Sequence, residues 1–213
     1  PYITPTGRKD LMKLDLNESY HFINDEIISE FKKFDYFTLS SYPEYTNLYK
    51  KLSQYTGRDT KEICITAGSV QALQILMQLF FHKGDEVVIP SPTFAFYFTL
   101  LNLVEVVPVT PLYKDRGNTF EFPFEETLKA LPEASKGLML CNPSNPIGCT
   151  IPAHEIEKLV ARAHELGIPA VVDEVYFEFF DETAVPLLDK YDNLIILRSF
   201  SKSFALAGLR LGY

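Results

Sequence analysis

Residues 151–174, IPAHEIEKLVARAHELGIPAVVDE, contain a helix pattern that is followed directly by a strand pattern. Pro152 stands near the first turn of the helix, acidic residues come early in it, and Gly167 is a typical C-terminal stop. The apolar run at 168–174 is typical of a buried strand. A helix and a buried strand in this order form the building unit of a parallel sheet covered by helices.

The same alternation continues on both sides of this unit. Further strands are predicted at residues 62–66, 85–90, 104–109, 137–141 and 193–199. Helices are predicted at residues 69–81, 93–103 and 122–132. We therefore expect an α/β fold whose mostly parallel sheet is flanked by helices, with residues 46–213 as its domain.

The first 45 residues differ, and we interpret residues 1–45 as an N-terminal arm that leads into the α/β domain. They are rich in Tyr and Phe, and they hold one amphipathic segment at about 23–34. The turn SSYPEYTN (40–47) precedes a predicted helix over residues 47–57.

Composition excludes several classes of protein. With 213 residues, of which 46% are hydrophobic, the chain can bury a real core. The net charge of −8 argues against nucleic acid or an anionic membrane as the main partner. No apolar run approaches a membrane span, and the start PYITPTGRKD lacks the apolar core of a signal peptide.

Three cysteines, Cys64, Cys141 and Cys149, form an odd count without metal-ligand spacing. Each sits in or beside an apolar strand-like run, so we expect buried, reduced thiols and no metal site. These features lead us to expect a cytoplasmic protein.

Polar residues follow several predicted strands, at the ends where doubly wound sheets bind their ligands. Gly68 and Ser69 form a strand-to-helix turn, which suits an anion or is an ordinary helix cap. Asn145 lies in an Asn-Pro-x-Asn-Pro turn, where turn chemistry explains most of the pattern. Asp173 follows an apolar run and needs a cationic or hydrogen-bonding partner, and Tyr176 can reach the same region.

The segment ILRSFSKSFALAGLRLGY (196–213) gathers two hydroxyls, an ammonium and a guanidinium. Ser199 and Ser201 precede Lys202, and Arg210, which we expect to be buried, lies eight positions beyond the lysine. These groups suit an anion; the alternative is a polar loop followed by a strand with a snorkelling arginine. One ligand satisfies this segment and the strand ends together. It is pyridoxal 5′-phosphate (PLP), which carries a phosphate, a phenolic oxygen, a basic ring nitrogen and an aldehyde.

At these motifs the sequence resembles the class I/II (fold-type I) PLP-dependent aminotransferases, and it is most similar to their histidinol-phosphate aminotransferase branch. The block SKSFALAGLRLGY (201–213), the Asn-Pro repeat and the Asp-x-x-Tyr motif carry the resemblance. LDLNES (14–19) and SYPEYTN (41–47) extend it over nearly the whole chain. The resemblance implies transfer of an amino group from an amino acid, or from an amino-alcohol phosphate such as histidinol phosphate, to a 2-oxo acid.

The resemblance also assigns roles to the residues that carry chemistry. Lys202 would form a Schiff base with PLP and act as general acid and base. Asp173 would keep the pyridine nitrogen protonated. Tyr176 and Asn145 would hydrogen-bond the phenolic oxygen.

Further contacts to the cofactor and substrate are implied in the same way. The phosphate would be held by Gly68, Ser69, Ser199, Ser201 and Arg210. Phe94 would stack on the cofactor ring, although a plain core position is its alternative. Tyr42 would reach the phosphate in the neighbouring subunit of a homodimer, and Asn17 and Tyr20 would lie over the substrate.

Other readings of the sequence remain open. Members of the resembled family continue well beyond the last motif, so we expect the large domain to be incomplete and the small C-terminal domain to be absent from this chain. The same cofactor residues would serve a PLP-dependent amino-acid-phosphate decarboxylase or another lyase. A non-catalytic binding module or an inactive fragment is the third possibility. A nucleotide-binding domain is disfavoured because no strand is followed by a glycine-rich G-x-G-x-x-G loop.

Overall fold

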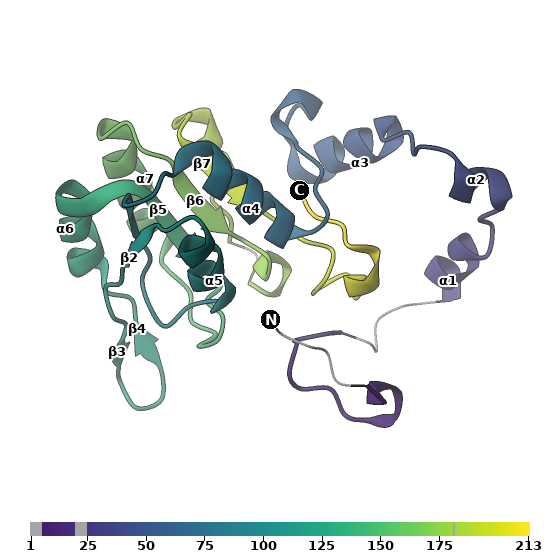
Figure 1. The fold of residues 1–213 in the computed structure, drawn as a ribbon, viewed down its shortest axis with the longest axis horizontal. Coiled ribbons are helices and arrows are strands. Elements are labelled where there is room, and N and C mark those ends of the chain that lie inside the picture. The colour runs from purple at the N-terminus through teal and green to yellow at the C-terminus, as the bar shows by residue number, and fades with distance from the viewer. Residues whose placement is uncertain (1–5, 20–24, 181) are drawn as a thin grey trace.

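The structure, a computed structural model, describes residues 6–19, 25–180 and 182–213. A five-stranded sheet with the order β2-β1-β5-β6-β7 forms its centre (Figure 1). Its strands are β1 (Glu86–Val88), β2 (Val107–Val109), β5 (Ser135–Cys141), β6 (Ala170–Asp173) and β7 (Leu194–Leu197). Every neighbouring pair in this sheet is parallel, which confirms the predicted fold class. A short antiparallel hairpin is added by β3 (Lys114–Asp115) and β4 (Phe120–Glu121).

Helices cover both faces of the sheet, and alternate strand residues point to opposite layers (Figure 1). Val172 packs in the cluster of α6 and α7, whereas its neighbour Val171 packs in the cluster of α4 and α5. Burying each large apolar side chain in these layers contributes about 1.5–3 kcal/mol. The four helices are α4 (Ser69–Phe80), α5 (Phe96–Leu103), α6 (Phe124–Ala134) and α7 (Ala153–Glu165).

Helix α7 has the boundaries that its sequence predicts. Pro152 occupies the N-cap position, and Gly167, just beyond the end, has a φ of 67° that few other residues tolerate. The helix buries one stripe at the spacing of an amphipathic helix, made of Ile156, Leu159, Val160 and Ala163.

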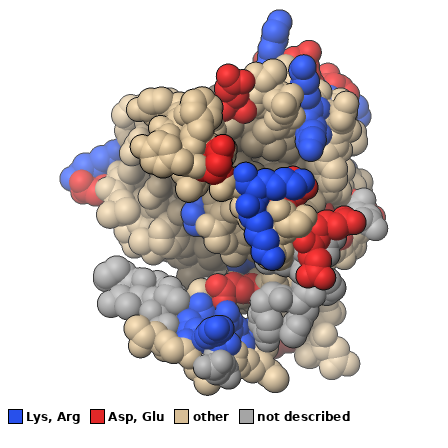
Figure 2. Space-filling model, turned by 90° about the vertical axis from the view of Figure 1, so that its right-hand side faces the viewer, with Lys and Arg blue, Asp and Glu red and all other residues tan. Residues whose placement is uncertain are grey.

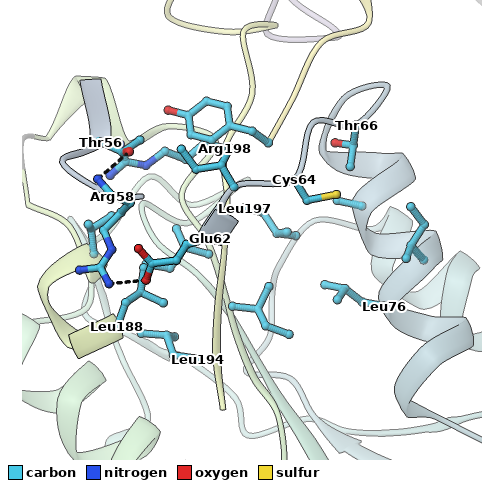
Figure 3. Close-up of a pocket in the computed structure, with 17 residues that line it drawn as sticks. Thr56, Arg58, Glu62, Cys64, Thr66, Leu76, Leu188, Leu194, Leu197 and Arg198 are labelled. Atoms are coloured by element: carbon cyan, nitrogen blue, oxygen red, sulfur yellow. Dashed lines mark hydrogen bonds and ion pairs between the residues drawn. The ribbon is translucent and has the colours of Figure 1, made fainter. Parts of the chain in front are cut away.

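The predicted strand at 62–66 is wrong. Thr60–Glu62 form a short 3₁₀-helix, and beyond it only Thr66 pairs, in an isolated bridge with Gly212. A cavity of about 260 Å³ lies beside this segment and β7, and its lining includes Cys64 from the segment and Leu194 from the strand (Figure 3). A strand needs a partner about 4.8 Å away, and the cavity occupies that place.

The cysteines are unpaired, but they are not uniformly buried. Cys141 is buried and Cys149 is half-buried. Cys64, in the segment that forms no strand, is exposed and lines the cavity, so the expectation of a third buried thiol is wrong.

Much of the described N-terminal arm stands apart from the sheet (Figure 1), although Leu16 and Asn17 contact residues that follow its strands. It contains a 3₁₀-turn (Arg8–Asp10), α1 (Asp25–Phe31) and α2 (Tyr36–Ser40), and it leads into α3 (Thr46–Thr56). Neither α1 nor α2 buries a residue, and α3 buries only Leu52. The apolar side chains of α1 and α2 are therefore left facing outward within this chain.

The surface in Figure 2 carries basic and acidic side chains side by side. None of the helices in the described ranges is long and apolar enough to cross a lipid bilayer.

Candidate active site

The polar residues selected from the sequence gather at the carboxyl ends of β6 and β7. The turn that begins α4 lies next to them, because Gly212 forms bridges both to Thr66 before that turn and to Ser199 beyond β7. Ligands of parallel α/β sheets bind at this edge, so the fold places the candidate residues where a site is expected.

Asp173 is a buried carboxylate at the end of β6. The hydroxyl of Tyr97 donates to its Oδ2 at 2.6 Å, and the backbone N–H of Val175 donates to its Oδ1 at 3.1 Å. Burial raises the pKa of Asp173 to about 6, although both hydrogen bonds act in the opposite direction. Within the described ranges, no Lys, Arg or His forms an ion pair with this carboxylate.

Tyr97 is a site residue that the sequence analysis missed. It is fully buried in α5, and the Phe94 ring packs edge-on against its own ring at 5.5 Å. The run TFAFYF is so aromatic that the sequence alone gives no signal separating a carboxylate partner from a core residue. Phe94 itself is half-buried, so its ring is partly free to contact a ligand.

Lys202 follows β7 and is partly buried. Its Nζ donates a hydrogen bond of 2.6 Å to the backbone carbonyl of Leu16, in the N-terminal arm. Burial is the main cause that lowers the pKa of Lys202; Glu18 opposes this shift and Arg210 adds to it. A lowered pKa leaves more of the amine neutral and nucleophilic near neutral pH.

The N-terminal arm also reaches Tyr176. The amide Nδ2 of Asn17 donates to the Tyr176 hydroxyl at 2.9 Å, and burial raises the pKa of that hydroxyl. The backbone of Asn17 has a φ of 52°, which turns the arm at this contact. The prediction for Tyr20 concerns a residue outside the described ranges.

Two glycines bring the backbone close together beside Arg210. A Cβ on Gly68, whose φ is 80°, would lie 2.8 Å from Nη2 of Arg210. A Cβ on Gly212 would lie 2.8 Å from the backbone of Gly68 and 2.9 Å from the carbonyl oxygen of Arg198. Only residues without a side chain let the backbone of Gly212 come this close to Gly68 at the start of α4. We call these backbone groups, with the first turn of α4, the glycine cup, and anions bind favourably at such a helix start.

The hydroxyls of the Lys202 turn line the same region. Ser199 and Ser201 are buried, and the Ser201 N–H donates to the Ser199 hydroxyl at 3.1 Å. Ser201 in turn accepts a long 3.5 Å hydrogen bond from Nη1 of Arg210. Arg210 is exposed rather than buried as expected; its backbone has a left-handed φ of 52°, and its guanidinium lies beside Gly68.

Three predicted residues have a looser connection to this cluster. Ser69 is the first residue of α4, directly after Gly68 in the cup. Asn145 lies half-buried in the turn after β5, whereas the neighbouring Asn142 uses its buried amide oxygen to accept the Ile151 N–H. Tyr42 is 99% exposed in the arm and does not join the site of its own chain.

Comparison with known proteins identifies the class. The sequence matches the family Aminotransferase class I and II over residues 9–213, and the chain belongs to this family. Histidinol-phosphate aminotransferases are among its curated relatives. That of Dehalococcoides mccartyi is 36% identical over 96% of this chain and 55% of its own length, and that of Ruminiclostridium cellulolyticum is 33% identical over 95% and 57%.

A solved structure supports the same assignment. Histidinol-phosphate aminotransferase from Sinorhizobium meliloti, in complex with pyridoxal-5′-phosphate, superimposes with a TM-score of 0.81 at 26% identity. The match covers 92% of this chain and 54% of that one. The present chain therefore spans about half the length of the relatives that it matches.

The glycine contacts lead to a first prediction. Gly212→Ala is expected to lower the free energy of unfolding by about 1–3 kcal/mol, because the new methyl group meets backbone atoms that cannot move aside. Gly208→Ala is the matched control, since a Cβ there meets nothing within 4 Å. Urea denaturation measures both variants, and equal midpoints for the two would contradict the close approach.

The raised pKa of Asp173 leads to a second prediction. Because the folded state favours the protonated acid, the stability that Asp173 contributes is present below pH 4 and is lost as the pH rises through about 6. Asp173→Asn is therefore expected to match the wild type near pH 4 and to exceed it by up to ~3 kcal/mol at pH 8. Urea denaturation of the protein without added cofactor, from pH 4 to 8, checks this; a pH-independent difference would refute it.

Proposed function

We propose that this protein is a PLP-dependent aminotransferase that moves an amino group from an amino acid, or from an amino-alcohol phosphate such as histidinol phosphate, to a 2-oxo acid. The observation that carries this proposal is the buried Asp173 carboxylate, which lacks a cation of its own in the described chain. A protonated ring nitrogen supplies that missing charge. The printed names of the relatives support histidinol phosphate as one amino donor.

The residues of the site fit PLP. The glycine cup with Arg210 suits a phosphate, and Asp173 suits the protonated ring nitrogen. Tyr176, which follows β6, and Asn145, in the turn after β5, would hydrogen-bond the phenolic oxygen. When bound, PLP supplies an aldehyde that reacts with amines and a ring that withdraws electrons from the substrate.

The chain's own groups then have distinct tasks. Lys202, with its lowered pKa, would take a proton at Nζ from the amino-bearing carbon of the donor, and would deliver a proton to the carbonyl carbon of the 2-oxo acid as that carbon receives the amino group. Asp173 holds its charge in a dry environment, and Tyr97 fixes the orientation of that carboxylate. The arm residues Leu16 and Asn17 cover Lys202 and Tyr176 and limit the access of water.

The third prediction tests the lysine. After incubation with PLP, treatment with sodium borohydride is expected to leave one pyridoxyl group, located on Lys202 by peptide mass mapping. Lys202→Ala is expected to lose the label and all turnover while still binding PLP noncovalently, because the cup and Asp173 remain.

Lys190→Ala is the control, because Lys190 pairs with Glu157 on the surface, and it should be labelled like the wild type. Labelling scattered over surface lysines, or none, would contradict the proposed site. With an amino donor and a 2-oxo acid supplied, release of carbon dioxide in place of amino transfer would point to a lyase.

We also propose that the working enzyme is a cytoplasmic homodimer in which Tyr42 completes the partner's phosphate site. Three unpaired cysteines fit a reducing compartment. The exposed apolar side chains of the arm support the dimer, since a second copy would bury them. They include Phe34, Tyr36, Phe37, Leu39 and Tyr42.

The fourth prediction tests whether Tyr42 and Lys202 of one site come from different subunits. At a PLP concentration that labels neither variant alone, a re-associated mixture of Lys202→Ala and Tyr42→Ala chains is expected to regain about a quarter of wild-type labelling. Each mixed dimer then has one site with Lys202 from one chain and Tyr42 from the other. If Tyr42 acted within its own chain, or if the protein stayed monomeric in sedimentation, mixing would restore nothing.

A further inference from the structure

Beside the candidate site lies a buried ion pair that the proposed chemistry does not use. Glu174 directly follows Asp173 and is fully buried, and Arg198, just after β7, is 3% exposed. Nη2 and Nε of Arg198 donate to Oε2 of Glu174 at 2.8 and 3.0 Å. Two charges at this depth require a complete set of partners.

The surroundings satisfy both charges. The Thr183 hydroxyl contacts both carboxylate oxygens at 2.8 and 3.0 Å and accepts from Nη2 of Arg198 at 2.7 Å. The Ala184 N–H donates to Oε1 of Glu174 at 2.6 Å. The ring of Phe177 covers the guanidinium, with 3.8 Å from its centroid to Cζ. The pair is therefore a fixed cross-link rather than a solvated contact.

This cross-link lies on the opposite face of the sheet from the site. Asp173 and Leu197 are paired in register on neighbouring strands, so the residues that follow them, Glu174 and Arg198, both turn to the other face. Asp173 and Ser199 stay on the side of the site. The ion pair thus joins the two strand ends that carry the site without touching a ligand there.

Arg198 also holds the segment that carries Arg210. Its N–H donates to the carbonyl of Tyr213 at 2.7 Å, and its carbonyl accepts from the Tyr213 N–H at 3.0 Å. Its side chain lines the cavity beside β7, as Figure 3 shows. Among the described strands, none pairs with the outer edge of β7. Arg198 therefore links β6, the turn at Thr183 and the segment that leads to the glycine cup.

We propose that the Glu174–Arg198 ion pair is a positioning device that sets the spacing between Asp173 and the Lys202–Arg210 half of the site. The inference rests on the proposed function, because PLP is the ligand that would contact both halves at once. Loss of the ion pair is expected to weaken the binding of a ligand that contacts both halves of the site more than the binding of a ligand that contacts one half.

The test compares PLP with inorganic phosphate in the Glu174→Gln variant. The dissociation constant for PLP is expected to rise at least tenfold, and borohydride labelling of Lys202 is expected to slow at least fivefold. The dissociation constant for inorganic phosphate is expected to change less than threefold. Glu157→Gln makes the same chemical change in the surface pair with Lys190 and should leave all three values unchanged. Leu159→Ala, a core cavity in α7, controls for lost stability alone.

Thr183→Val is the second variant, since it removes the shared hydroxyl while leaving both charges, and it carries the test if Glu174→Gln does not fold. A wild-type PLP dissociation constant and labelling rate in Glu174→Gln and Thr183→Val would overturn the positioning role alone. An equally large loss of PLP binding in Leu159→Ala would do the same. A wild-type protein that acquires no label on Lys202 would instead overturn the proposed function on which the inference rests.

Discussion

A carboxylate buried without a countercharge is the constraint on which the rest of the site depends. Asp173 lies at the end of a strand buried on both faces, where water cannot solvate it. Tyr97 and one backbone N–H stabilise the oxygens but supply no positive charge. The fold thus keeps an unfavourable charge in place, and a cationic ligand that pairs with this carboxylate gains binding free energy and stabilises the folded protein.

The main elements of the fold could be predicted because they depend on local patterns. Helix α7 and strand β6 each have apolar periodicity and clear boundaries. The segment at 62–66 has the same local pattern, yet whether it becomes a strand depends on a neighbour across space, and the cavity beside β7 takes that place. Strand pairing of this kind is not encoded in a window of five residues.

The site was predictable to the extent that its residues follow strands. Asp173 ends β6, and Tyr176 and Lys202 follow β6 and β7 within a few residues, so parallel topology alone brings them to one edge. Tyr97 and Arg198 could not be found in this way, because a tyrosine among aromatics and an arginine after LIIL show no partner in sequence. The arginine expected to be buried, Arg210, is exposed, and the buried one is Arg198.

The cavity beside β7 leaves room for one more strand at the outer edge of the sheet. Leu194–Leu197, the sequence LIIL, ends the sheet with its outer backbone groups unpaired by any described strand, and the stretch carries no charge. Tyr213 already exchanges two backbone hydrogen bonds with Arg198 just beyond this edge, so an extended segment in the cavity would continue the sheet by the same backbone pairing.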